Sequence, residues 1–179
     1  MTTTFPVHDD DVAMLMKIRR YLVGYRVCND WSQPDLSMRI NNTKGGAYDL
    51  EHSTRWAWRF SRLQAWAAAF DLRIKVRLIF DHDFGLEQRV EEHPEVAPFL
   101  ALARTTDPWQ KWQRIALTSM MKVARTEQGI NTQTLAERLG VTRKAVSDWE
   151  ALSDEVLLSG VLHRARALGG RLHIELEGI

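Results

Sequence analysis

The stretch from Thr134 to Glu150, TLAERLGVTRKAVSDWE, restricts the fold of this chain more than any other segment. Leu135 and Leu139 recur at helical spacing, and Val146 with Trp149 resumes an apolar face after a short gap. Residues three or four positions apart share one face of an α-helix, so each side of the gap predicts an amphipathic helix. The segment therefore predicts two short helices joined by a tight turn.

The residues around the gap suit such a turn. Ala136 is small at the point where two helices crossing at a steep angle would touch. Gly140 can take the positive φ that ends a helix, and Thr142 is a favoured N-cap for the next one. The outer face of the second helix is then expected to offer polar groups to base edges, through Arg143, Lys144, Ser147 and Asp148.

This order of small, glycine, hydroxyl, branched apolar and acidic positions resembles the helix-turn-helix of the lambda-repressor and Cro-like family. The resemblance implies that the second helix enters the major groove of double-stranded DNA and that its early residues touch bases. The same spacing is also compatible with a simpler structure, an amphipathic helical hairpin without a DNA role.

A second copy of the pattern lies in the segment Gln33–Glu51, at a constant distance of 99 positions (150 − 51 = 99). Such self-similarity is the signature of a structural repeat. Downstream of the motif the distance becomes 98, where Ile74 aligns with Leu172 and Leu78 with Leu176. The pairs at a distance of 99 are Leu22 with Met121, Arg26 with Arg125, Leu36 with Leu135, Ser37 with Ala136, Ile40 with Leu139, Asn41 with Gly140, Thr43 with Thr142 and Glu51 with Glu150.

Each half is therefore expected to contain a long first helix, a helix-turn-helix, another helix and a strand with period-2 alternation. The expected fold is mainly α with one short β-strand per repeat, arranged as two tandem helix-turn-helix domains. The domain at 1–80 ends in the strand Leu72–Phe80, and the domain at 107–179 ends in the strand Arg171–Glu177. Residues 81–106 are expected to form an acidic connector.

Charge along the chain agrees with this division, although the net charge is only +1. Residues 1–80 hold 12 Lys and Arg against 8 Asp and Glu, and residues 101–179 hold 11 against 9. Between them, residues 81–100 hold 1 against 6. Two basic regions that flank an acidic one suit two DNA-facing modules, because attraction to phosphates depends on local patches.

The resemblance also implies a role for individual residues. Base contacts are expected from the start of each second helix, and phosphate contacts from the start of each first helix and from the turns. In the first half, Asn41 replaces the turn glycine, and a double glycine leaves few large side chains, so that half is expected to read DNA shape. The expected base readers are Arg143, Lys144, Ser147, Asp148, Lys44, Gly45, Gly46, Tyr48 and Asp49, and the expected phosphate contacts are Ser32, Gln33, Thr43, Thr132, Gln133 and Thr142.

Composition narrows the remaining alternatives. A single cysteine, Cys28, cannot form an internal disulfide, and the N-terminus lacks the features of a signal peptide, so a cytoplasmic location is expected. No apolar run reaches membrane-spanning length. The triplet Asp81–Asp83 lacks further ligands at metal-binding spacing, and no catalytic set or phosphate loop is evident. We therefore expect no metal, no cofactor and no enzymatic activity.

The expected function is a sequence-specific DNA-binding repressor, similar to the immunity repressors of temperate actinobacteriophages such as mycobacteriophages. Because the two expected reading segments differ, one monomer is expected to cover one asymmetric site, although a homodimer stays open. The alternative is an antitoxin-like regulator that docks protein and acts as a dimer.

Two further segments have structural interpretations. The stripe of Trp56, Phe60, Leu63, Ala67 and Phe70 has helical spacing and predicts a helix packed on the core. The two terminal strands carry opposite charges on matching faces, so they are expected to pair with each other or with a second chain.

Overall fold

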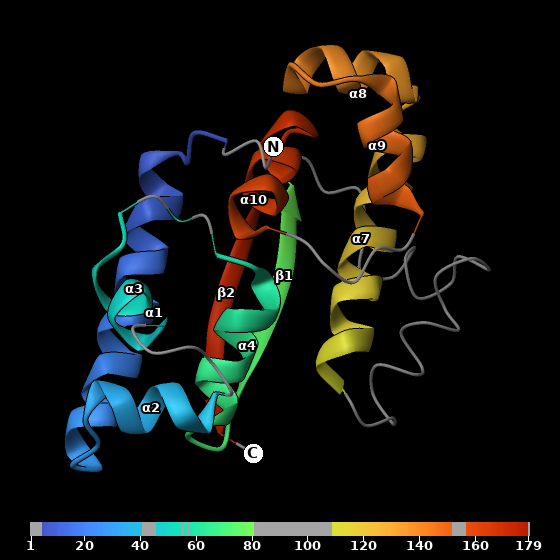
Figure 1. Cartoon of the computed structure of the whole chain (residues 1–179). Coiled ribbons are helices and arrows are strands. Elements are labelled where there is room, and N and C mark those ends of the chain that lie inside the picture. The colour runs from blue at the N-terminus through green and yellow to red at the C-terminus, as the bar shows by residue number, and fades with distance from the viewer. Residues whose placement is uncertain are drawn as a thin grey trace.

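The computed structural model describes residues 5–40, 46–54, 56, 58–80, 109–151 and 157–178, without the side chains of Trp109 and Trp112. Within these ranges the chain is mainly helical, with eight α-helices and one two-stranded sheet (Figure 1). None of these helices is both long enough and apolar enough to cross a membrane. The predictions that lie outside the described residues concern Asn41, Thr43, Lys44, Gly45, the triplet Asp81–Asp83 and the connector 81–106.

The first half contains four helices and a strand, each formed where its sequence favours it. Three consecutive acidic residues open the first helix, where carboxylates are stabilised by the positive end of the helix dipole. The second helix begins with a capping box in which Ser32 and Asp35 satisfy each other's backbone N–H groups. The elements are α1 (Asp9–Cys28), α2 (Gln33–Arg39), α3 (Gly46–His52), α4 (Phe60–Ala68) and β1 (Leu72–Phe80).

The second half repeats this order. The predicted turn is confirmed, because Gly140 ends a helix in the left-handed region at φ 64°. The predicted N-cap is confirmed too, since the Thr142 hydroxyl accepts a hydrogen bond from the Ala145 N–H at 3.2 Å. The elements are α7 (Trp109–Glu127), α8 (Thr132–Leu139), α9 (Arg143–Glu150), α10 (Leu158–Ala167) and β2 (Gly170–Gly178).

The two strands pair with each other within the chain, which confirms one of the two predicted pairings. They are antiparallel, and their register runs from Leu72 opposite Gly178 to Phe80 opposite Gly170. One face of the sheet is apolar and packs against α4 and α10. The other face is charged, with Arg77 3.7 Å from Glu175 across the strands.

The two halves are related by an approximate two-fold axis through this sheet. The bounds of β2 follow those of β1 by 98 positions, as 170 − 72 and 178 − 80 both show. At the centre of the register Val76 pairs with Ile174, its own counterpart (174 − 76 = 98). An isolated bridge joins Arg59 to Leu157, again at a distance of 98 (157 − 59 = 98). Contacts between equivalent residues define a two-fold relation.

The first helix of each half packs against the last elements of the other half. Helix α1 contacts β2, and α7 contacts α4. Arg166 of α10 holds Asp11 of α1 at 2.8 Å, and Arg114 of α7 donates to Gln64 of α4 at 2.6 Å. The buried apolar side chains of both halves form one cluster. The halves are therefore interlocked.

The predicted aromatic stripe packs on the core, but its two end residues, Trp56 and Phe70, lie outside the helix. Phe60, Leu63 and Ala67 are fully buried, and Phe70 packs partly buried against them. Helix α4 begins only at Phe60, whereas Trp56 precedes it in the left-handed region at φ 48°. Trp56 reaches the same core because its ring packs edge-on against Trp58 at 5.1 Å.

Candidate nucleic-acid interface

Helices α8 and α9 are held by a single arginine of α7. Arg125 makes two hydrogen bonds to the carboxylate of Glu150, at 2.6 and 2.9 Å, and a third to the backbone carbonyl of Ile130 at 2.6 Å. This guanidinium thus connects the long helix, the loop before α8 and the end of α9. Bidentate arginine–carboxylate pairs fix orientation as well as distance.

The outer face of α9 carries the four predicted base readers of the second half. Arg143, Lys144, Ser147 and Asp148 are all exposed, while Val146 is buried beneath them. Lys144 pairs with Asp148 at 2.7 Å, one helical turn away. An ion pair this exposed contributes little stability, so either side chain can exchange it for another partner. Arg143 makes no ion pair with any described residue.

The same arginine arrangement holds α2 and α3. Arg26 of α1 makes hydrogen bonds to Glu51 at 2.6 and 3.0 Å and to the carbonyl of Trp31 at 2.7 Å. Each of these residues lies 99 positions before its counterpart around Arg125. The two helix pairs therefore share one internal scaffold.

The reading face of α3 differs from that of α9. Gly46 is buried, and its carbonyl accepts from Arg62 of α4 at 2.8 Å, so this predicted reader has no surface to present. The next N–H, of Ala47, is capped from inside by the hydroxyl of Ser37. Tyr48 is 55% exposed and stacks on His52 with centroids 4.2 Å apart. Asp49 is exposed beside it.

The residues predicted to contact phosphate differ in their exposure and in their hydrogen-bond partners. Thr142 uses its oxygen as an acceptor in the N-cap and keeps its O–H as a donor. Ser32 both accepts from and donates to Asp35, which lowers the pKa of that carboxyl chiefly through the side-chain hydrogen bond. The amide of Gln33 turns to Glu51 at 2.8 Å and is half-buried. Thr132 is half-buried at the start of α8, next to the exposed Gln133.

Several residues that support α9 have no signature in the sequence pattern. Burial lowers the pKa of Arg164 to about 10, opposed by Glu150, so this guanidinium stays charged beneath the helix. Its planar group lies over the ring of Trp149 at 4.6 Å. Phe5 contacts the same ring and stacks on His163 at 4.9 Å. The fold brings Phe5 to this site, and no repeat in the surrounding sequence indicates that position.

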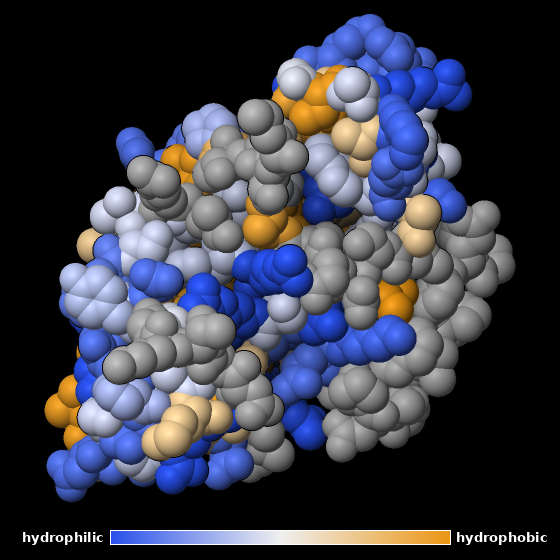
Figure 2. All heavy atoms as spheres, in the orientation of Figure 1, coloured by the Kyte–Doolittle hydropathy of each residue, from blue (hydrophilic) through white to orange (hydrophobic). Residues whose placement is uncertain are grey.

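The two helix pairs lie on opposite sides of the sheet in Figure 1, with α2 at lower left, α3 at middle left, and α8 and α9 at upper right. The surface over α8 and α9 is mostly hydrophilic on the face shown in Figure 2. Among the described side chains, no group of three His, Cys, Asp or Glu is placed to hold a metal ion. The arrangement offers two helix faces attached to one continuous apolar core.

The class of structure is thus a mainly helical chain with two similar helix pairs joined across a small antiparallel sheet. No known protein family matches the sequence, and no characterised protein or solved structure is similar to it.

Proposed function

We propose that this chain is a sequence-specific DNA-binding repressor that uses two unlike helix-turn-helix heads, α2–α3 and α8–α9. The carrying observation is the exposed polar face of α9, held on a scaffold that recurs in the other half. Arg143 would make bidentate contacts to guanine, and Lys144 would contact a guanine or a phosphate. Repression would follow from occupancy of promoter DNA.

The relation between the halves supports a monomer as the binding unit. Pairing of Val76 with Ile174 and of Arg59 with Leu157 places equivalent residues against each other, as two subunits of a symmetric dimer would. On this proposal one chain supplies both heads, which many helix-turn-helix proteins bring together by pairing two subunits. Once one head binds, the other is present at a high effective concentration, which raises affinity without new contacts.

The heads differ, so the proposed DNA site is asymmetric. The first head presents Tyr48 and Asp49 rather than two cations. A tyrosine can pack on a thymine methyl or donate to an acceptor in the groove, and a carboxylate accepts from cytosine. The first head is therefore proposed to select its half of the site weakly, and partly through DNA shape.

The test is selection of bound duplexes from a random pool, followed by footprinting and light scattering of the complex. The expected result is one chain on one asymmetric site. Two chains on a palindrome would overturn the stoichiometry, and no enrichment of any sequence would overturn specific DNA binding.

A charge-matched pair of variants separates base contacts from simple attraction to phosphate. Arg143→Ala removes one positive charge from the outer face of α9, and Arg20→Ala removes one from the exposed side of α1. The first change should weaken binding to the selected site much more than to random DNA, whereas the second should weaken both slightly. Equal losses at both sites in the Arg143 variant would reduce this residue to a phosphate contact.

A further inference from the structure

The two-stranded sheet leaves the outer edge of each strand without a strand partner in the described chain. In an antiparallel pair, alternate residues direct their N–H and C=O groups away from the partner strand. Ile174 is such a residue, because its N–H points to the sulfur of Met14 at 3.3 Å. Leu176, two positions on, directs its backbone groups to the same side. Thioether sulfur is a weak acceptor, so this edge is poorly satisfied.

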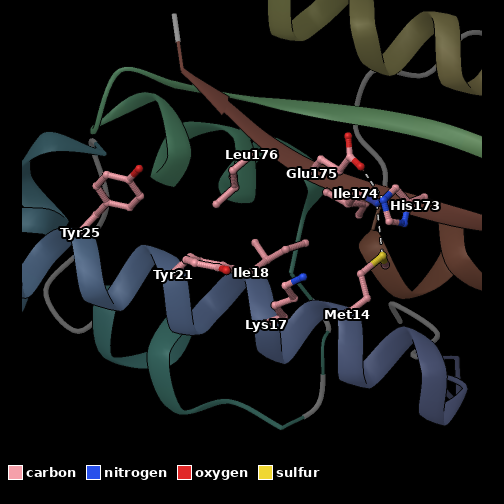
Figure 3. Close-up of a pocket in the computed structure, with 9 residues that line it drawn as sticks. All are labelled: Met14, Lys17, Ile18, Tyr21, Tyr25, His173, Ile174, Glu175 and Leu176. Carbon is pink, nitrogen blue, oxygen red and sulfur yellow. Dashed lines mark hydrogen bonds and ion pairs between the residues drawn. The ribbon is translucent and has the colours of Figure 1, made fainter.

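A groove of about 510 Å³ runs along this edge, between β2 and α1 (Figure 3). Its strand side is formed by four consecutive residues, His173 to Leu176, and its helix side includes Lys17, Tyr21 and Tyr25. The two tyrosines are 57% and 42% exposed. Exposed aromatic side chains next to unpaired strand backbone are unusual on a surface that contacts only water.

The equivalent place in the other half is built from different residues. Ile74 of β1 directs its carbonyl outward, where the side-chain amide of Gln113 on α7 donates to it. The positions of α7 that correspond to Tyr21 and Tyr25 are Met120 and Ala124, of which Ala124 is buried. The two outer edges therefore differ, because an outward carbonyl of β1 has a side-chain donor on α7, whereas the outward N–H of Ile174 meets only a thioether sulfur.

We infer that the groove between α1 and β2 binds an extended peptide segment of a partner protein, which adds to the outer edge of β2 as a third strand. Strand addition uses backbone hydrogen bonds for affinity and alternate side-chain pockets for specificity. The groove's volume lies within the usual range for sites that enclose a small ligand, so it accommodates a short segment. Apolar side chains of the peptide would lie on Ile18 and the tyrosines.

Charge specifies the peptide further. Lys17 makes no ion pair with any described residue, whereas Glu175 is already paired with Arg77 and with His173. The unpaired cation in the groove is therefore Lys17, and the peptide should carry a carboxylate opposite it, from an acidic side chain or a free C-terminus. This site is separate from the outer face of α9, so it stands independently of the proposed DNA binding.

The test begins with a displayed library of short peptides selected on the full chain. The best peptide is then synthesised with N-methyl groups on alternate amides and titrated by fluorescence anisotropy. Methylation of the amides that face β2 should weaken binding roughly tenfold or more, because each removes a backbone hydrogen bond, while methylation of the intervening amides should not. Absence of any binding peptide, or equal effects of both methylation patterns, would overturn the inference.

Matched variants locate the site. Tyr21→Ala and Lys17→Glu should each weaken peptide binding roughly tenfold, while Met120→Ala, at the equivalent position of the other half, should leave it unchanged. Circular dichroism checks that the exposed substitutions leave the fold intact. A molar mass that rises with concentration in the unchanged chain but not in the Tyr21→Ala variant, with no peptide selected from the library, would instead assign the groove to a second copy of the chain. Neither outcome affects the DNA test, which depends on Arg143.

Discussion

The two helix pairs have the same internal support and different outer surfaces. Arg26 and Arg125 make matching sets of three hydrogen bonds, each to a glutamate and to one backbone carbonyl. Outside this support, α9 begins at an exposed arginine, whereas α3 begins at the buried Gly46. The difference shows that the internal support of a helix pair can stay the same while the side chains on its outer surface change.

The largest expected effect is loss of the shared support. Arg125→Met should destabilise the chain by about 3–5 kcal/mol, because the half-buried carboxylate of Glu150 loses both of its hydrogen bonds to Arg125. Arg26→Met should cost a similar amount through Glu51. Thermal unfolding measures both, with Arg20→Met as a control for loss of an exposed arginine. If only one of the two arginine substitutions lowers the free energy of unfolding by this amount, the two supports are not equivalent.

Removal of the Trp149 ring from the inner side of α9 should cause the next largest loss of stability. Trp149→Ala should cost about 3 kcal/mol, at the low end for tryptophan because the side chain is only partly buried. Amide hydrogen exchange should then rise in α9 more than in α3. Uniform exchange across both helix pairs would show that the ring stabilises the whole core rather than one head.

The proposed contacts of the two heads should differ in DNA binding. Arg143→Ala should weaken binding to the selected site by roughly 1–3 kcal/mol and relax preference at particular base pairs. Tyr48→Ala should have a smaller effect, confined to the other half of the footprint. Footprinting of both variants on the same duplex makes the comparison. Relaxation of the same base pairs by both changes would contradict two separate heads.

Acidification through the titration range of histidine should loosen the second half more than the first. Burial lowers the pKa of His163, so the folded chain binds fewer protons than the unfolded chain below the ordinary imidazole pKa of about 6.5. The contribution of His163 to the free energy of unfolding is therefore fully present above that pH and is lost as the pH falls below it. Hydrogen exchange in α9 and α10 should report the loss, since the counterpart of His163 is Ala65. His163→Phe keeps a ring against Phe5 and should abolish the response; its persistence would implicate another group.

The smallest expected effect lies on the charged face of the sheet. Lys75→Glu removes an exposed contact with Glu177 at 4.0 Å and places a carboxylate opposite another, which should cost about 0.2–1 kcal/mol. Arg20→Glu is the charge-matched control on α1. If the two variants melt alike, the contact across the strands contributes nothing beyond net charge.

Much of the fold could be predicted from local pattern. Helical spacing located α8 and α9, and the glycine and threonine between them fixed the turn and the cap. The repeat distance of 99 positions aligns Arg26 with Arg125 and Glu51 with Glu150 in the sequence alone. In the structure each arginine pairs with the glutamate of its own half. These features are predictable because each depends on residues close in sequence or repeated at one interval.

The contacts between the halves could not be predicted in the same way. Asp11 and Arg166 are 155 positions apart, and each resembles an ordinary surface charge until α1 lies against α10. The sequence predicts Gly46 at the surface, and this prediction is wrong. Its burial depends on a contact with Arg62, which belongs to another helix and is not indicated by the local pattern. Trp56 has helical spacing, yet it precedes α4 because packing against Trp58 and Arg19 prevails over the local pattern.

The pairing of β1 with β2 also sets the order in which a new chain can fold. Residues 72–80 leave the ribosome well before residues 170–178. The strand LRIKVRLIF therefore has no partner strand while about ninety further residues are synthesised. Contacts between distant parts of a chain close slowly, and an apolar strand without its partner is prone to pair with a neighbouring molecule. When several ribosomes translate one mRNA, neighbouring nascent chains can therefore pair through this strand. The risk ends only when residues 170–178 have left the ribosome and paired with it.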